Sequence, residues 1–165
     1  MANQFVTIRM YNVGFGDAFL LLFPDRSRPR RVLIDCGMHS IGPGPRKMKE
    51  VVKQIVQDTT DADGQSRIDV VVATHRHQDH VSGFGQPLWE KVEVGEVWMP
   101  WTEHPTDPRA RQIRETQSTR AHSLALALTR LNVDDSVLAI AQNNLTNQAA
   151  MSTLHAGFAG QPQRR

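Results

Sequence analysis

One short stretch constrains the fold of this 165-residue chain more than any other. An apolar run at residues 68–73 has the composition of a buried strand, and His75, His77, Asp79 and His80 follow it closely. Side chains two positions apart in an extended chain point to the same side, so His75 and His77 can bind one metal ion. Asp79 and His80 can turn toward a second ion nearby. Imidazoles with a carboxylate suit zinc or another first-row metal, so the stretch predicts a metal site. A solvated polar loop is the weaker alternative, because so many ligand-type residues gather here.

Two further apolar strands are expected upstream, each next to an aspartate. Residues 18–23 are nearly all apolar, as in a sheet covered on both faces, and they follow Gly16 and Asp17. Residues 31–35 form another apolar stretch, which ends at Asp35. The sequence therefore predicts two strands that bring carboxylates to their ends, before the strand that carries the histidines.

Hydrophobic periodicity predicts the remaining elements. Apolar residues at helical spacing indicate a helix over residues 46–58, packed by one face on a sheet. Asp107-Pro108 starts a long helix, because the missing N–H of proline has no partner to lose in a first turn. Residues 137–141 fit either a short strand or the start of a helix. Strands at 5–11 and 94–98 and a helix at 146–158 complete the expected set.

The histidine stretch resembles the HxHxDH signature of the metallo-β-lactamase superfamily, and both upstream strands agree with it in order and spacing. Residues 13–18 and the strand after them resemble the first hairpin of the subgroup related to the hydrolase-like domain of DNA-uptake channel proteins. Residues 32–37 resemble the strand that ends at the first aspartate of the family. The resemblance spans residues 5 to about 100. It implies an α+β fold of the αββα sandwich type.

The resemblance also implies a metal-dependent hydrolase. One or two zinc ions, or other divalent metals, would be held by His75, His77, Asp79 and His80. A zinc-bound hydroxide would then attack a small-molecule ester or a phosphodiester-type substrate. Asp79 would also serve catalysis by orienting the water or moving its proton. A catalytic role for this chain therefore depends on whether the metal site is complete.

Two aspartates outside the histidine stretch are expected to support it. In the family, the aspartate that matches Asp35 holds the ligand loop by hydrogen bonding rather than binding metal. A buried capping carboxylate is the alternative for Asp35. Asp17 either orients a metal ligand from the rim of the site or bonds its own backbone in a turn.

The family normally completes its two-metal site with a third histidine, a bridging aspartate and a further histidine from the second half of the fold. After His80 the chain contains only His104, His122 and His155. None of these three follows a strand end with a glycine-containing loop, which is the usual context of the missing ligands. The metal site is therefore expected to be incomplete within this chain.

The domain is expected to be incomplete in the same way. Residues 1–165 form one metallo-β-lactamase-like domain by length, corresponding to the N-terminal half of the fold, with a core at about residues 5–131. The fold should then lack its C-terminal side, and residues 157–165 should form a flexible tail. Half a sandwich exposes a sheet face, so a homo-oligomer or a C-terminal half in a longer parent or partner would supply the cover. The alternative function is a catalytically incompetent metal-binding fragment or an interaction module.

Composition excludes few partners. The formal net charge is +2 and the basic run at residues 26–31 is local, so a nucleic-acid-binding module is disfavoured, although nucleic acid as a substrate is not excluded. Cys36 is the only cysteine, which rules out an intramolecular disulfide. Neither a signal peptide nor a long apolar span is recognised, so we expect a cytoplasmic protein without membrane contact.

Overall fold

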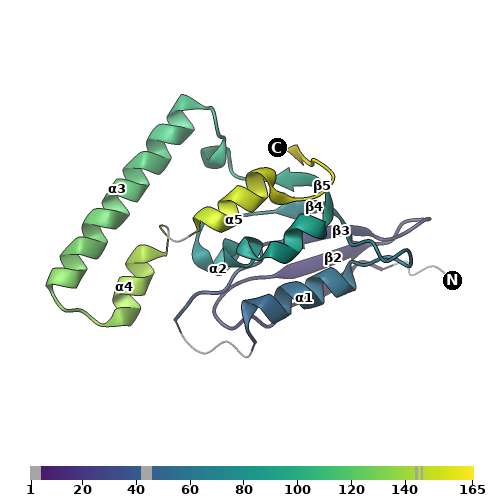
Figure 1. The fold of residues 1–165 in the computed structure, drawn as a ribbon, viewed down its shortest axis with the longest axis horizontal. Coiled ribbons are helices and arrows are strands. Elements are labelled where there is room, and N and C mark those ends of the chain that lie inside the picture. The colour runs from purple at the N-terminus through teal and green to yellow at the C-terminus, as the bar shows by residue number, and fades with distance from the viewer. Residues whose placement is uncertain (1–4, 42–45, 144, 146) are drawn as a thin grey trace.

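The computed structural model describes residues 5–41, 46–143, 145 and 147–165, and their strands form one six-stranded mixed sheet (Figure 1). The strand order follows the chain, with β1 to β3 antiparallel and β3 to β6 parallel. The strands are β1 (Thr7–Met10), β2 (Phe19–Phe23), β3 (Arg30–Ile34), β4 (Arg67–Val72), β5 (Glu93–Trp98) and β6 (Gln163–Arg164). The strands expected at 5–11, 18–23, 31–35, 68–73 and 94–98 are thus confirmed within two residues.

The helices lie between strands along the chain. They are α1 (Met48–Asp58), α2 (Gln78–Val81), α3 (Pro108–Arg130), α4 (Asp135–Gln142) and α5 (Gln148–Ser152), with short 3-10 helices at Ser82–Gly85, Pro87–Lys91 and Trp101–Glu103. Helix α1 lies between β3 and β4, α2 between β4 and β5, and α3 to α5 between β5 and β6. The helix expected at 46–58 is confirmed as α1. Residues 137–141, which fit either a strand or a helix, are helical in α4. Among the described residues, no helix combines the length and hydrophobicity needed to cross a bilayer.

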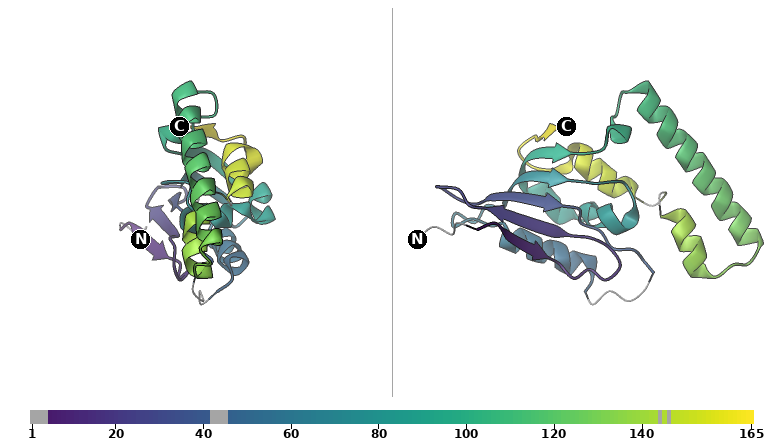
Figure 2. Two further views of the ribbon diagram at one scale, coloured as in Figure 1. Left: turned by 90° about the vertical axis from the view of Figure 1, so that its left-hand side faces the viewer. Right: turned by 180° about the vertical axis from the view of Figure 1, so that it is seen from behind.

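One face of the sheet carries the core. Leu20, Leu33, Val71 and Val97 lie side by side across four strands, and all four are fully buried. Helix α1, helix α5 and the 3-10 helices cover this row, with Trp89 as the largest buried side chain (Figures 1 and 2). The burial of these apolar side chains is the main force that fixes α1 against the sheet.

The opposite face is open, as Figure 2 shows from behind. Cross-strand register places Ile8 beside Leu21 and Met10 beside Phe19 on this face. Ile8 is 66% exposed and Met10 is 70% exposed, although both belong to a paired strand. Arg9, between them, points to the covered face, where it pairs with Asp58 of α1. The described residues therefore form two layers, and the αββα sandwich stays a prediction.

Helices α3 and α4 extend away from the sheet and pack on each other (Figure 1). Helix α3 begins as expected at Pro108, where Asp107 Oδ1 accepts a hydrogen bond from Ala110 N. Two of its leucines remain largely in water, with Leu124 51% exposed and Leu126 61% exposed. The apolar positions of α3 therefore add little to the core around the sheet.

Residues 157–165 differ from the flexible tail expected for them. Phe158 is buried against Phe84 and Trp89, and residues 163 and 164 form β6 beside β5. Backbone hydrogen bonds make this pairing, including Arg165 N to Val97 O at 2.9 Å, and such bonds do not depend on side-chain type. A polar sequence can therefore add an edge strand without an apolar signal.

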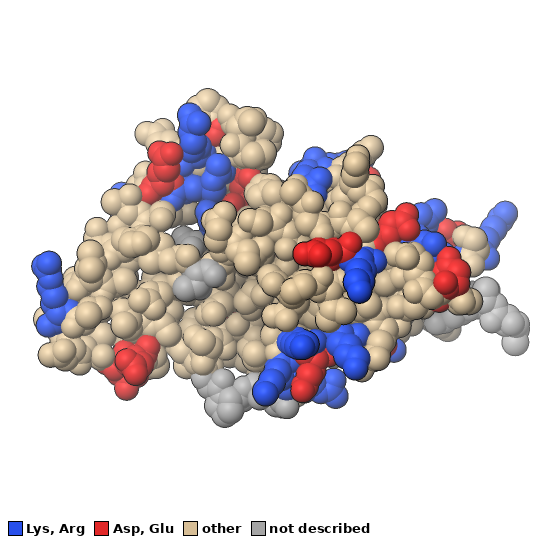
Figure 3. Space-filling model, in the orientation of Figure 1, with Lys and Arg blue, Asp and Glu red and all other residues tan. Residues whose placement is uncertain are grey.

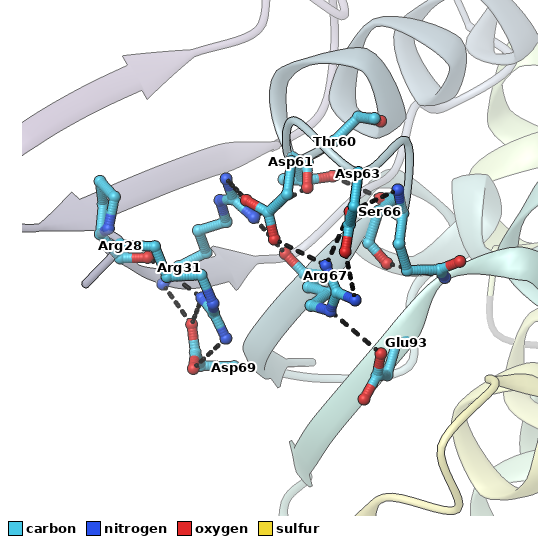
Figure 4. Close-up of polar contacts among 12 residues, drawn as sticks. Arg28, Arg31, Thr60, Asp61, Asp63, Ser66, Arg67, Asp69 and Glu93 are labelled. Carbon is cyan, nitrogen blue, oxygen red and sulfur yellow. Dashed lines mark hydrogen bonds and ion pairs between the residues drawn. The ribbon is translucent and has the colours of Figure 1, made fainter.

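An ion-pair network lies at the edge of the sheet where β4 begins (Figure 4). Arg28 points its side chain toward Asp69, to which the backbone N of Arg31 also donates, whereas the side chain of Arg31 pairs with Asp61. Arg67 lies among Asp61, Asp63 and Glu93. The arginine run at 26–31 is thus largely engaged with carboxylates. On the side of the molecule that Figure 3 shows, basic and acidic side chains are interspersed along the rim.

Candidate metal centre

The histidine stretch forms a loop and a short helix at the carboxyl end of β4. Strand β4 stops at Val72, and helix α2 begins at Gln78, directly after His77. The amides of His80 and Val81 both donate to His77 O, which fixes the turn that carries Asp79 and His80. Since β3 and β4 are parallel, the segment after β3 reaches the same edge of the sheet. This arrangement brings Asp35 to the histidines.

The three imidazoles of the stretch contact one another. The ring centroids of His75 and His80 are 3.8 Å apart, and those of His75 and His77 are 4.7 Å apart. Burial, followed by the neighbouring rings of His80 and His77, lowers the pKa of His75 below its ordinary value of 6.5. A neutral His75 has a nitrogen lone pair free for a metal, as ligation requires.

Asp35 orients two of these rings through a hydrogen-bond relay. Its carboxylate accepts from Thr74 N at 2.8 Å and from Thr74 Oγ1 at 2.6 Å, and Oδ2 lies 2.9 Å from His80 Nδ1. Because Thr74 Oγ1 gives its proton to Asp35, it is left to accept from His75 Nδ1 at 3.0 Å. Both rings are then protonated at Nδ1, so Nε2 of each ring carries the lone pair that is able to bind a metal ion.

The backbone at Asp35 is unusual as well. Asp35 is 3% exposed and has φ of 53°, in the left-handed region that non-glycine residues rarely adopt. With this backbone conformation, the Asp35 carboxylate contacts Thr74 and His80 in the loop that follows β4. Outliers of this kind gather at functional sites, which supports a supporting role for Asp35.

Two glycines, one in the β1–β2 loop and one after β3, allow their segments to approach the histidine loop closely. A Cβ on Gly37 would lie 2.4 Å from both Asp79 C and His80 N, and one on Gly16 would lie 2.7 Å from Asp79 O. In the space so gained, Asp17 N donates to Asp79 O at 3.0 Å and Cys36 N donates to His80 O at 2.8 Å. The Asp17 carboxylate, 44% exposed, lies 3.5 Å from His80 Nδ1 at the rim.

Asp79 is held as a carboxylate. Burial raises its pKa, but the hydrogen bond from Asn143 Nδ2 to Oδ1 at 3.1 Å and the nearby histidines outweigh that effect. The pKa of Asp79 is therefore lowered below its ordinary value of 3.8. Its Oδ2 lies 3.3 Å from His80 Nε2. The Asp79 carboxylate and Nε2 of His80 therefore face each other at the site.

Asparagines from the segment after α4 secure the loop, and nothing in the sequence pattern identified them. Asn143 Oδ1 accepts from Gln78 N at 2.6 Å, while its Nδ2 contacts Asp79. Asn147, 4% exposed, donates to Arg76 O at 2.6 Å and to Asn143 O at 2.8 Å. Asparagines are common in linkers between helices for many reasons, so the sequence alone does not indicate that these two hold the histidine loop. Their role is seen only from the contacts in the structure.

The donor types at this site fit zinc, but the set is not complete within the described residues. The free Nε2 atoms of His75 and His80 and the Asp79 carboxylate are suitable zinc ligands. Nevertheless, no group of three or more histidine, cysteine, aspartate or glutamate side chains in the part of the chain that the structure describes is arranged to hold a metal ion. His77 is exposed beside the cluster.

The three later histidines do not complete the group. His104 ends a 3-10 helix, where its Nδ1 accepts from Asp107 N at 3.1 Å. His122 lies exposed on α3, and His155 lies in the helical turn after α5. Within residues 5–41, 46–143, 145 and 147–165, none of them joins the loop histidines in a metal-binding set.

The fold and this edge define a class of protein: a mixed α/β domain with a histidine-rich loop at the carboxyl ends of parallel strands. The model of the metallo-beta-lactamase superfamily matches residues 13–120, which is more than half of the chain. The chain belongs to this superfamily. No curated protein matches the sequence significantly. Membership suggests a metal-dependent hydrolase, because members of the superfamily typically bind zinc.

Proposed function

We propose that this chain is a metal-dependent hydrolase domain that acts on an ester or a phosphodiester. His75, His77, Asp79 and His80 would hold one or two zinc ions. The observation that carries the proposal is the relay from Asp35 through Thr74, which leaves Nε2 of His75 and of His80 free on neighbouring rings. Histidine ligands of metals typically have their second ring nitrogen hydrogen-bonded in this way.

The residues of the chain divide the work at this site. When bound, zinc supplies acidification of water and polarisation of the scissile group. Asp79, kept ionised beside Asn143, can accept a proton from a water in the site. Asp35 keeps both rings in one tautomer, and Asp17 stays at the rim within reach of His80. The resemblance of residues 13–18 to DNA-uptake proteins favours phosphodiesters among the substrates.

The second candidate is a metal-binding domain without activity of its own, whose remaining ligands come from a longer parent or a partner. The absence of a complete metal-binding group among the described residues favours it. Two or three donors per ion give weak and exchangeable binding, whereas a complete site holds zinc through dialysis. The two candidates therefore differ in metal stoichiometry.

Elemental analysis after dialysis tests both candidates, with His77→Ala as the site variant. His122→Ala is a matched control, because His122 is exposed on α3 and outside the cluster. The hydrolase proposal expects one to two zinc ions per chain in the control and loss in His77→Ala. It also expects metal-dependent hydrolysis of bis(p-nitrophenyl) phosphate or p-nitrophenyl acetate. Substoichiometric zinc and no turnover would favour the second candidate, and equal zinc in both variants would overturn the assigned ligands.

A further inference from the structure

A small cavity near the carboxyl ends of two parallel strands has no part in the site described above. It has a volume of about 220 Å³ and lies where β5 and β6 end, lined in part by Trp101, His104, His155 and Arg164. Because β4, β5 and β6 are parallel, this is the same edge of the sheet that carries the histidines. Ligands of open α/β sheets bind outside the carboxyl ends of strands. We call this cavity the Trp101 pocket.

A buried ion pair joins the pocket to the histidine loop. Glu103, which lines the pocket and is 6% exposed, lies 3.8 Å from Arg76. Arg76 stands between His75 and His77 in the chain, so this contact connects the histidine loop to one residue of the pocket lining. Glu103 has Arg76 as its charge partner, and among the described residues no ion pair joins Glu103 to Arg164.

Arg164 lines the pocket and has no carboxylate partner in the part of the chain that the structure describes. Its Nε donates to Leu154 O at 3.2 Å and its terminal nitrogen donates to Pro162 O at 2.9 Å. Among the described residues no carboxylate pairs with Arg164, whereas Arg165 beside it pairs with Glu96 at 3.1 Å. A guanidinium held by carbonyls has donors left for an anion, which it binds through paired N–H groups.

Two histidines that line the pocket with Arg164 also favour the binding of an anion. His104 Nδ1 accepts from Asp107 N, so the ring proton is on Nε2 and is available as a second donor. Burial, followed by Arg164, Arg114 and Arg76, lowers the pKa of His155, as expected where positive charge already accumulates.

Trp101 supplies the apolar wall. Its indole is half exposed and lines the cavity. The exposed indole can stack on a planar ring. The cavity is smaller than the roughly 300–1,000 Å³ of sites for drug-sized ligands. One ring with one acidic group therefore suits its size.

We propose that the Trp101 pocket binds the anionic group of an aryl or heteroaryl phosphate or carboxylate, with the ring on Trp101 and the anion on Arg164. As a statement about substrate, the proposal rests on the proposed function. It then assigns the hydrolase a substrate that carries an acidic group on a ring beside the bond to be cleaved. Binding of the anion in the Trp101 pocket does not require a metal ion, so it can be tested on the metal-free chain.

Calorimetric titration of the full chain after metal removal tests the binding. Phenyl phosphate and benzoate are the probes, and benzyl alcohol is the neutral counterpart. We expect at least one anion to bind, the alcohol to bind at least about tenfold more weakly, and Arg164→Gln to weaken the anion by about tenfold or more. The tighter anion identifies phosphate or carboxylate as the preferred group. Trp101→Ala should weaken both anions.

Two control variants keep the test specific. Arg130→Gln removes an exposed arginine at the end of α3, and Trp98→Ala removes an indole from the open sheet face, and both should bind the probes as the unchanged chain does. Absence of binding, equal binding of benzyl alcohol, or unaltered binding in Arg164→Gln would overturn the proposal. His77→Ala should lose zinc but keep the probes, so failure of the pocket and failure of the metal site are distinguishable.

Discussion

Asp35 connects the backbone of the fold to the orientation of the histidine rings. Its carboxylate reaches Thr74 twice and His80 once, from a backbone with positive φ. Each of these bonds needs an acceptor, and an ionised carboxylate has enough lone pairs for all three. A neutral amide in the same place has one acceptor oxygen and two donor hydrogens. The charge and the acceptor capacity of Asp35 can therefore be tested apart from its shape.

Asp35→Asn should keep the fold and weaken the metal site. Asparagine tolerates the left-handed backbone, so the substitution leaves φ unstrained. Its NH₂ group faces Thr74 or His80 in place of an acceptor. We expect zinc affinity to fall about 10- to 100-fold, measured by chelator competition, and stability to fall by about 1–3 kcal/mol.

Asp25→Asn is the control for Asp35→Asn, since Asp25 pairs with Arg30 on the surface, at the opposite end of β3 from Asp35. It should leave zinc affinity unchanged. Unaltered zinc affinity in Asp35→Asn would show that the relay does not orient the ligands.

The sequence predicted those site residues whose position relative to a strand decides their role. Asp35 follows β3, and His75, His77, Asp79 and His80 follow β4, so the parallel pairing of these two strands brings Asp35 to the histidine loop. Asn143 contacts Gln78 across 65 residues of chain, and no local pattern encodes that separation. Arg164 was likewise hidden, because β6 pairs through its backbone rather than through apolar side chains.

At the scale of elements, one carboxylate ties the β2–β3 hairpin to β4. Asp69 on β4 accepts two bonds from Arg28, one from Arg30 and one from Arg31 N, and its side chain is 16% exposed (Figure 4). Burial raises the pKa of Asp69, but these bonds outweigh it and lower the pKa below its ordinary 3.8. The network therefore stabilises the hairpin only while Asp69 is ionised.

Asp69→Asn should destabilise the chain in a pH-dependent way. A carboxylate whose folded pKa is lowered contributes stability above its unfolded pKa and loses it as pH falls through the folded value. The variant should lose about 1–3 kcal/mol at neutral pH. Below pH 3.8 its unfolding free energy should fall less steeply than that of the unchanged chain. Urea unfolding at neutral pH and at two values below 3.8 measures both effects.

Asp63→Asn is the matched comparison for Asp69→Asn. Asp63 also meets an arginine, but its side chain is 56% exposed and Arg67 keeps Asp61 and Glu93 as partners. A surface pair of this kind contributes about 1 kcal/mol or less. Equal losses in the two variants would contradict the stabilising role assigned to the Asp69 network.

At the scale of the whole molecule, the two faces of the sheet differ in kind. The covered face holds the core, while the other presents Ile8, Leu21, Met10 and Phe19 in adjacent cross-strand pairs. Contiguous apolar surface of this kind marks association in soluble proteins. An exposed sheet face could be predicted from the sequence only through the family resemblance. The alternation of apolar and polar residues within β1 does not indicate which face of the sheet is left without a second layer.

The open face should make the chain associate in solution. Ile8→Lys combined with Met10→Lys places charge on it at two positions that are already 66% and 70% exposed. Since little apolar area is lost, thermal stability should change by no more than about 0.5 kcal/mol. Sedimentation velocity over a concentration series should show association of the unchanged chain and a monomeric double variant.

Leu131→Lys, 72% exposed after α3, is the control and should associate as before. A chain that stays monomeric at every concentration would mean that this face needs no second copy, and the search for its cover should turn to a different partner.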